Sequence, residues 1–147
     1  MSTVVNMSTE ANKASMRRFY DEVFNKKNRA AIDEFIDPNQ VDHDAPPGTP
    51  GGLKGAKQTI TMYLTAFPDL HFTVEDLIAE GDKVVARLTV RGTHQGIFMG
   101  IPPTGKKATS TAIDINRIVG GKSVEHWLKM DSLGLLQQLG VIPAPGQ

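Results

Sequence analysis

Two short segments carry the side chains of this chain that are best suited to moving a proton. An acid, Asp114, stands in one segment, and a histidine, His126, follows in the next. A further candidate, His43, is flanked by Asp42 and Asp44. Carboxyl and imidazole groups that share an apolar space can transfer protons to and from atoms near a carbonyl group. These residue types indicate general acid/base chemistry.

The surroundings of such groups decide whether they titrate near neutral pH. Burial of a carboxyl group among apolar side chains raises its pKa from about 4, and a histidine near its ordinary pKa of about 6.5 can donate or accept a proton. On this hypothesis Asp114 is the proton shuttle, and His126 and His43 polarise the substrate or assist. Structural roles stay open: a strand or arginine partner for the acid, a core position for His126, and a loop hydrogen bond for His43.

Several other chemistries are disfavoured by the residues present. The chain has no cysteine, which excludes disulfides, thiolate metal sites and a cysteine nucleophile. Consecutive residues of an extended segment alternate faces, so Asp42, His43 and Asp44 are not expected to reach one metal ion together. The loop 100–105 lacks the Lys-Ser/Thr ending of a phosphate loop, and no Gly-x-Ser-x-Gly motif is present. We predict no metal site.

Composition indicates a soluble globular protein. The 147 residues suit one domain, with 39% hydrophobic and 22% charged residues. The formal net charge is zero, which argues against nucleic-acid binding, because such binding depends on basic contacts to phosphates. No apolar stretch is long enough to span a bilayer, and the first residues do not resemble a signal peptide. A cytoplasmic protein that contacts neither nucleic acid nor membrane is expected.

Apolar residues at helical spacing predict three helices in the first half of the chain. The inward residues are Met16, Phe19, Tyr20, Val23 and Phe24 in the first helix, Ala31, Ile32, Phe35 and Ile36 in the second, and Ile60, Tyr63, Leu64 and Phe67 in the third. Ser8 or Thr9 can cap the first helix, and Asn28 breaks it. The second and third helices are expected to stop at Pro38 and Pro68.

The second half alternates apolar and polar residues, which predicts strands at 70–79, 83–94, 108–119 and 123–131. The first of these is expected to contain a bulge before Leu77. Tight turns are predicted at Glu80-Gly81-Asp82 and Gly120-Gly121. A closing helix capped by Asp131 or Ser132 carries four leucines and ends at Gly140.

Helices followed by antiparallel strands indicate the α+β class rather than a doubly wound fold. We find no repeat or second boundary, so residues 10–141 are predicted to form one domain between tails at 1–9 and 142–147. Strand alternation puts Ser110, Ala112, Asp114 and Asn116 on one face, and His126 and Leu128 on one face of the last strand. A sheet curled around long helices would enclose a cavity at one end.

Three pairs of short motifs carry a resemblance to a known family. They are Phe67-Pro68-Asp69-Leu70 with Glu75-Asp76-Leu77, Arg91-Gly92-Thr93-His94-Gln95-Gly96 with Gly100-Ile101-Pro102-Pro103-Thr104-Gly105, and Ile113-Asp114-Ile115-Asn116-Arg117-Ile118 with Glu125-His126-Trp127. By their order and spacing the chain resembles the SnoaL-like polyketide cyclases, or ester cyclases, of the nuclear transport factor 2-like superfamily. The resemblance extends over nearly the whole chain.

This resemblance implies a cystatin-like cone, in which a curved antiparallel sheet is wrapped around the N-terminal helices. It also implies a homodimer, for which Trp127 is the expected interface residue. Cyclases of the family close the last ring of aromatic polyketides by an intramolecular aldol step without metal or cofactor, so no cofactor is predicted. Their acid/base aspartate corresponds to Leu128 here, and their assisting histidine corresponds to Asp114.

The resemblance also implies that Asp114 and His126 project into one cavity. The predicted substrate-binding residues are Asp42, Tyr20, Phe24, Tyr63, Phe67, Asn116 and Leu128. Two functions follow as hypotheses. The first is a cofactor-independent isomerase, cyclase or hydratase that acts on a hydrophobic carbonyl compound such as a polyketide. The alternative is a carrier or sensor that binds a lipophilic small molecule without turning it over, which an apolar Leu128 favours.

Overall fold

The computed structural model describes residues 8–146, so most of the expected N-terminal tail lies outside the described residues. The helical segments are α1 (Thr9–Phe19), η1 (Tyr20–Asn25), η2 (Arg29–Ala31), α2 (Ile32–Phe35), α3 (Gly52–Ala66) and α4 (Ser132–Gln138). The strands are β1 (Ile36–Asp42), β2 (His71–Glu80), β3 (Lys83–Thr93), β4 (Lys107–Val119) and β5 (Lys122–Met130). No helix among the described residues is long and apolar enough to span a membrane.

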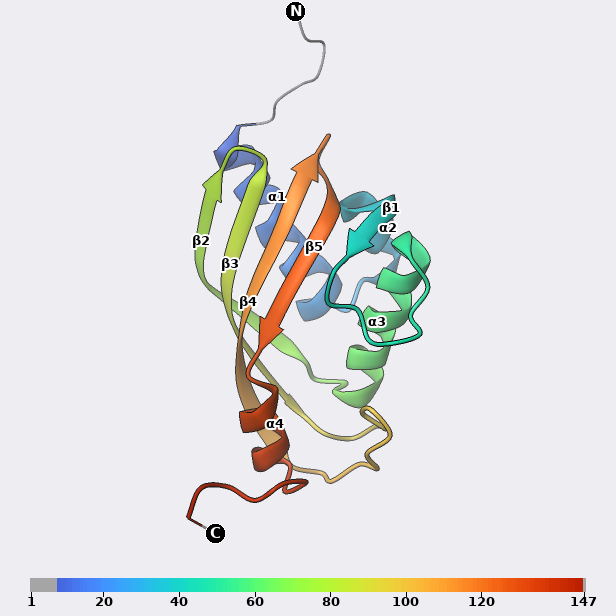
Figure 1. Ribbon diagram of the computed structural model, residues 1–147, viewed down its shortest axis with the longest axis vertical. Coiled ribbons are helices and arrows are strands. Elements are labelled where there is room, and N and C mark those ends of the chain that lie inside the picture. The colour runs from blue at the N-terminus through green and yellow to red at the C-terminus, as the bar shows by residue number, and fades with distance from the viewer. Residues whose placement is uncertain (1–7, 147) are drawn as a thin grey trace, which may run out of the picture.

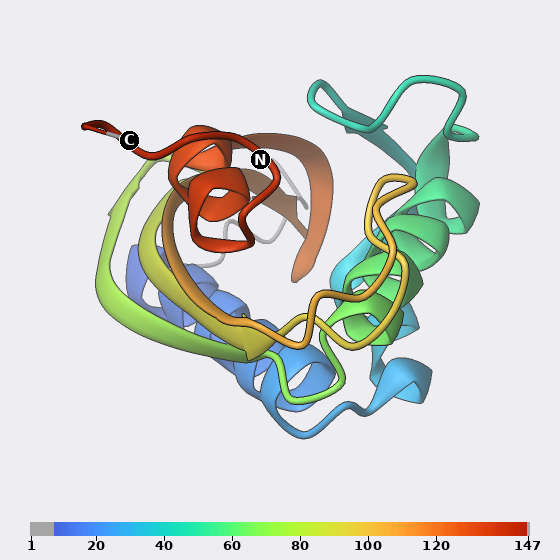
Figure 2. The same ribbon diagram turned by 90° about the horizontal axis from the view of Figure 1, so that it is seen from below.

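The five strands form one curved sheet in the order β1-β5-β4-β3-β2, with α1 behind it and α3 beside β1 (Figure 1). Figure 2 shows the curvature from below, with the loop that follows β3 lying next to α3. Backbone hydrogen bonds from Gln95 and Gly96 to the carbonyl oxygen of Ala66 hold that loop against α3. The α+β class and the cone are therefore confirmed.

The first helix is capped at its start and changes from an α-helix to a π-helix at its end. Ser8 caps α1 by accepting a hydrogen bond from the N–H group of Ala11, which satisfies one of the free donors at a helix start. The expected single helix then widens into the π-helix η1 at Tyr20. Wide turns of this kind often occur at functional sites. Here the wide turn buries Tyr20, Val23 and Phe24 together.

The sheet is mixed rather than entirely antiparallel, because a strand absent from our sequence prediction forms at residues 36–42. This strand, β1, runs parallel to β5, with Asp42 opposite His126. Pro38 was expected to end a helix but lies inside β1. A proline is tolerated there because β1 is an edge strand and one side of its backbone needs no donor.

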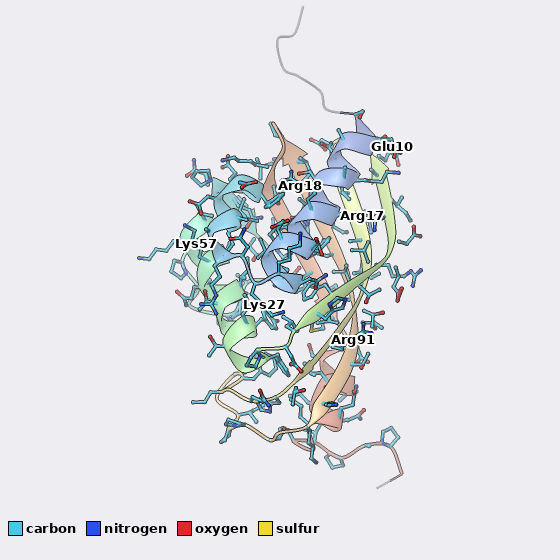
Figure 3. The ribbon with its side chains drawn as sticks, turned by 180° about the vertical axis from the view of Figure 1, so that it is seen from behind. Glu10, Arg17, Arg18, Lys27, Lys57 and Arg91 are labelled. Atoms are coloured by element: carbon cyan, nitrogen blue, oxygen red, sulfur yellow. The ribbon has the colours of Figure 1, made fainter. Side chains whose placement is uncertain are left out.

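The other elements agree closely with the prediction. A register shift between Val74 and Asp76 is the expected bulge in β2, and Asp131 caps α4 through the N–H group of Gly134. Buried and exposed residues alternate along β4, so its inner face packs on the helices. The back of the molecule, by contrast, carries exposed charged residues such as Arg17, Lys57 and Arg91 (Figure 3).

Candidate active site

A mainly apolar cavity lies between the inner face of the sheet and helices α1, η1 and α3. Its empty volume is about 740 Å³, part of which is open to solvent. Aromatic and aliphatic side chains form most of its wall. The polar lining residues are Tyr20, Gln40, Asp42, Thr59, Tyr63, Asp114, Asn116 and His126. An apolar pocket with a few convergent polar groups is the usual form of a small-molecule site.

Asp114 reaches this cavity from the middle of β4. Strand alternation turns it inward, and the residue is 5% exposed. Its direct cross-strand partner on β5 is Leu128, whereas His126 pairs with Asn116. His126 therefore meets Asp114 along the diagonal of the ladder, a separation that long side chains can bridge.

Three donors converge on the Asp114 carboxylate. The hydroxyl of Tyr20 donates to Oδ2 at 2.5 Å, and the amide of Asn116 donates to the same oxygen at 3.1 Å. His126 Nε2 lies 2.5 Å from Oδ1. All three groups can donate, so a carboxylate at this position can accept every one of these hydrogen bonds.

His126 lies between two carboxylates. Its Nε2 faces Asp114, and its Nδ1 lies 3.0 Å from Oδ1 of Asp42. Burial of the ring opposes its charge, but the two carboxylates outweigh burial and raise the pKa of His126 to about 10. The ring is thus a cation at neutral pH that donates from both nitrogens, and the expectation of a histidine titrating near 6.5 is wrong.

The neighbouring titratable groups are shifted in complementary directions. Burial acts to raise the pKa of Asp42, but the hydrogen bond and charge of His126 prevail and lower it. Burial and the adjacent Asp114 carboxylate raise the pKa of Tyr20 well above its usual value. Tyr20 therefore remains a neutral hydrogen-bond donor at neutral pH.

A buried chain of hydrogen bonds holds Asn116 in place. Gln40 Nε2 donates to Ser123 Oγ at 2.8 Å, and Ser123 Oγ donates to Asn116 Oδ1 at 2.6 Å. With its oxygen engaged, the amide of Asn116 presents its N–H group to Asp114. Ser123 can face inward together with His126 because the register shifts there, leaving Val124 as an extra residue on β5.

The cavity opens between α3 and β5. The half-buried lining residues gather on two sides: Ala56, Thr59 and Tyr63 on α3, and Asp42, His126, Leu128 and Met130 on β1 and β5. The remaining lining residues are buried except for Phe72, which is half-buried. Asp42 and His126 are thus nearer to solvent at this gap than the buried Asp114.

Two of the predicted site residues lie elsewhere. His43 projects outside the cavity, where Nε2 is 2.7 Å from Oε2 of Glu125 and the ring stacks on Trp127 at 4.7 Å between centroids. The structure therefore does not bring His43 to Asp114, because His43 directly follows the inward-facing Asp42 at the end of β1 and consecutive residues of an extended chain face opposite sides. Phe67 is buried beside His94 and Phe98 rather than in the main cavity.

The other predicted residues all line the cavity: Tyr20, Phe24, Asp42, Tyr63, Asp114, Asn116, His126 and Leu128. The sequence did not lead us to Gln40 or Ser123. It predicted Tyr20 as a lining residue but not the hydrogen bond from Tyr20 to Asp114. Gln40 could have been found, since it shares the face of Asp42 once residues 36–42 are treated as a strand. Among residues 8–146, no group of three histidine, aspartate or glutamate side chains has the arrangement of a metal site.

Comparison with known proteins agrees with this architecture. The family model described as SnoaL-like polyketide cyclase matches residues 14–139. Nogalonic acid methyl ester cyclase of Streptomyces nogalater is 31% identical over 119 residues, which cover 80% of this chain and 89% of that protein. Aklanonic acid methyl ester cyclase DnrD of Streptomyces peucetius is 31% identical over 108 residues, which cover 73% of this chain and 72% of that protein.

Among solved structures, TsrD from Streptomyces laurentii superposes with a TM-score of 0.84 at 32% identity, covering 92% of this chain and 99% of that one. The family match spans most of the chain, and the curved sheet with its helices has the same form as this neighbour. The chain therefore belongs to the SnoaL-like polyketide cyclase family.

Proposed function

We propose that this protein is a cofactor-independent acid/base enzyme that acts on a hydrophobic carbonyl compound, with Asp114 as the base. The observation that carries the proposal is the Asp114 carboxylate, held by Tyr20, Asn116 and His126 at the polar end of an apolar cavity. The family description, polyketide cyclase, and the names of the relatives, methyl ester cyclases, support a polyketide ester as the substrate class.

The reaction begins with removal of a proton from the carbon next to the substrate carbonyl. The C–H electron pair moves toward that carbonyl, whose oxygen becomes negative, and the proton goes to Asp114. Negative charge thus leaves the carboxylate and appears on the substrate. The donors that held the carboxylate, Tyr20 and the cationic His126, can then turn to the enolate oxygen.

The captured proton returns to the product, so the protein ends in its starting state. In an aldol ring closure the enolate carbon attacks a second carbonyl, and the resulting alkoxide takes the proton from Asp114. In an isomerisation the proton returns to a different carbon. Either route needs the carboxylate and an oxyanion donor within reach of one apolar substrate, which are the groups gathered here.

A carrier or sensor is the second candidate, and two observations favour it. By the family resemblance, the acid/base aspartate of the cyclases corresponds to Leu128, which is an apolar residue of the cavity wall. The Asp114 carboxylate also already accepts three hydrogen bonds, so a substrate must displace one of them. A tightly satisfied carboxylate can orient a bound molecule without taking a proton from it.

Hydrogen exchange separates the two functions. We suggest 1-tetralone, an apolar ketone with slowly exchanging hydrogens beside its carbonyl, as the first probe in D₂O, followed by the methyl esters named for the relatives. Mass spectrometry measures deuterium uptake. An enzyme speeds the exchange, and Asp114→Asn lowers the catalysed rate by about a hundredfold or more. A ligand that binds but exchanges no faster than in buffer supports the carrier.

Asp69→Asn is a matched control for this experiment. The Asp69 carboxylate also accepts hydrogen bonds, from the backbone N–H and hydroxyl of Thr93 at 2.7 Å each, but it does not line the cavity. The Asp69→Asn variant should therefore exchange the probe at the wild-type rate. Equal losses in both variants would show that general loss of structure, rather than loss of the base, explains the Asp114 result.

A homodimer is a further part of the proposal. Trp127 lies on the outer face of β5, half-buried, with the His43 ring stacked on it and Lys83 Nζ 5.9 Å from the ring centroid. Analytical ultracentrifugation of the wild type and Trp127→Ala tests it. A wild-type monomer would contradict the proposed dimer, and a dimer unaffected by the substitution would place its interface elsewhere.

A further inference from the structure

A second, smaller cavity adjoins the main one beneath α4. Its empty volume is about 290 Å³, including space open to solvent. Three residues, Tyr63, Val90 and Met130, line both cavities. The two spaces are therefore neighbours that share one wall, rather than separate features of the molecule.

The far side of the smaller cavity is built from a firmly attached helix. Leu135 of α4 contributes to its lining and is 7% exposed. The side chain of Gln138 fastens α4 to β4 by accepting from the backbone N–H of Thr109 at 2.8 Å and donating to its carbonyl oxygen at 2.7 Å. This paired contact holds α4 against β4 and so keeps Leu135 in the wall of the smaller cavity.

The smaller cavity is apolar. Its wall includes Phe67, Leu70, Ala108 and Leu135. The hydroxyl of Ser110 is engaged, because it donates to the carbonyl oxygen of Asp131 at 3.0 Å. Arg91 is exposed at the back of the molecule (Figure 3), so its cation does not occupy the interior. In the part of the chain that the structure describes, the wall of the smaller cavity therefore has no cluster of charged groups like the one around Asp114 in the main cavity.

The shared wall contains a side chain that can move. Met130 is the last residue of β5 and is half-buried. Methionine is unbranched and has a polarizable thioether, so it adapts to ligands of different shape at little cost. Met130 is thus a flexible residue of the shared wall, whereas the β-branched Val90 of the same wall is stiff.

We propose that the smaller cavity receives an apolar chain of the same molecule whose carbonyl group lies at Asp114, and that Leu135 sets the length of chain accepted. The proposal rests on the function proposed above for its account of the carbonyl end. It adds that the substrate carries a hydrocarbon side chain at the end remote from the reacting carbonyl. Met130 is the residue such a chain passes.

A homologous series of ketones tests this inference through binding alone. The probes are 1-tetralone and its 6-ethyl, 6-butyl and 6-hexyl derivatives, which carry the chain opposite the carbonyl. Calorimetry measures each Kd. Each methylene that enters an apolar compartment should tighten binding by at most about fourfold, and the gain should stop when the compartment is full.

Two opposite substitutions and one control show where the chain lies. Leu135→Phe should shorten the chain length at which the gain stops, and Leu135→Ala should lengthen it, with little change for unsubstituted 1-tetralone. Leu139→Ala is the control, since Leu139 is the C-terminal cap residue of α4 and is 2% exposed but lines neither cavity. Thermal unfolding establishes that each variant is folded.

An unchanged chain-length profile in folded Leu135 variants, or an equal shift in Leu139→Ala, would overturn the inference. If neither Leu135 variant folds, the wild-type series decides: a gain that never stops, or no gain, contradicts a closed compartment. Because only binding is measured, such a failure would leave the proton-transfer proposal standing. Conversely, if the protein does not speed hydrogen exchange but the binding series shows a clear limit of chain length, the proton-transfer proposal fails and the inference about the smaller cavity stands.

Discussion

Asp114 Oδ1 and His126 Nε2 lie 2.5 Å apart although their residues are diagonal rather than direct neighbours in the β4–β5 ladder. The direct neighbour of Asp114 is Leu128, at the cavity mouth. The diagonal contact leaves His126 free to bind Asp42 on its other side. His126 between two carboxylates is the electrostatic centre of this site, and four predictions concern this site and its neighbours.

Removal of the tyrosine hydroxyl tests the donor side of the site. Tyr20→Phe deletes one hydrogen bond to a carboxylate, so the free energy of unfolding should fall by about 1.5–3 kcal/mol in denaturant titrations. Exchange of 1-tetralone should slow by roughly a hundredfold if Tyr20 also donates to the enolate. Tyr63→Phe is the control, because its hydroxyl lines the same cavity without bonding Asp114. Similar losses of exchange in both variants would argue against a specific donor role.

The charge of His126 should depend on Asp42. Asp42→Asn removes one of the two carboxylates that raise the pKa of His126, so this pKa should fall from about 10. NMR titration of the ring proton signals measures the change, with the other histidines as internal references. Asp44→Asn is the matched control. The Asp44 carboxylate accepts hydrogen bonds from the backbone N–H of Leu128 and from Lys129 Nζ, so its removal should change the His126 pKa less. Equal shifts in the two variants would contradict the contact seen here.

Stability should decline on the alkaline side of neutrality. The pKa of His126 is raised from 6.5 to about 10, so its contribution is fully present below pH 6.5 and is lost as the pH rises to about 10. Asp42 acts in the opposite direction: its lowered pKa gives a contribution present above about pH 4 and lost in acid. Denaturant unfolding at pH 6 and pH 9.5 should differ by on the order of a few kcal/mol.

His126→Gln is the control for that pH dependence, since glutamine retains hydrogen-bonding capacity without a titrating proton. Its free energy of unfolding should be lower at pH 6 and should change much less between pH 6 and pH 9.5. A variant that loses as much stability as the wild type over this range would show that other groups cause the alkaline decline.

A carboxylate at residue 128 would test the charge balance of the cavity. Leu128→Asp places an acid directly opposite Asp114, and like charges at facing positions repel. We expect the free energy of unfolding to fall by about 1–3 kcal/mol at pH 8 and to recover partly at pH 5, where one carboxyl can take a proton. Leu128→Asn, whose side chain has nearly the shape of aspartate without its charge, should not regain stability at pH 5. A pH-independent loss in Leu128→Asp would mean that packing, not repulsion, dominates.

Local patterns in the sequence determined much of the scaffold. Alternation along 108–119 placed Asp114 and Asn116 on the buried face of β4, because the period of a strand depends only on its own backbone. Helical spacing identified the buried stripe of α1 and α3, and turn residues located the hairpins. The same local logic placed His126 and Leu128 on one face of β5, and both line the cavity.

Tertiary structure decided which groups touch. The bonds of Asp114 to Tyr20 and of Asp42 to His126 join residues 94 and 84 positions apart, and no local period encodes such pairings. Parallel pairing of β1 with β5 turned Asp42 inward and His43 outward. The contact with Asp42 that results helps to raise the pKa of His126 from its ordinary value to about 10. Electrostatics depends on distances of a few ångströms between distant segments, so only the folded chain could set the chemistry of residues that the sequence had already identified.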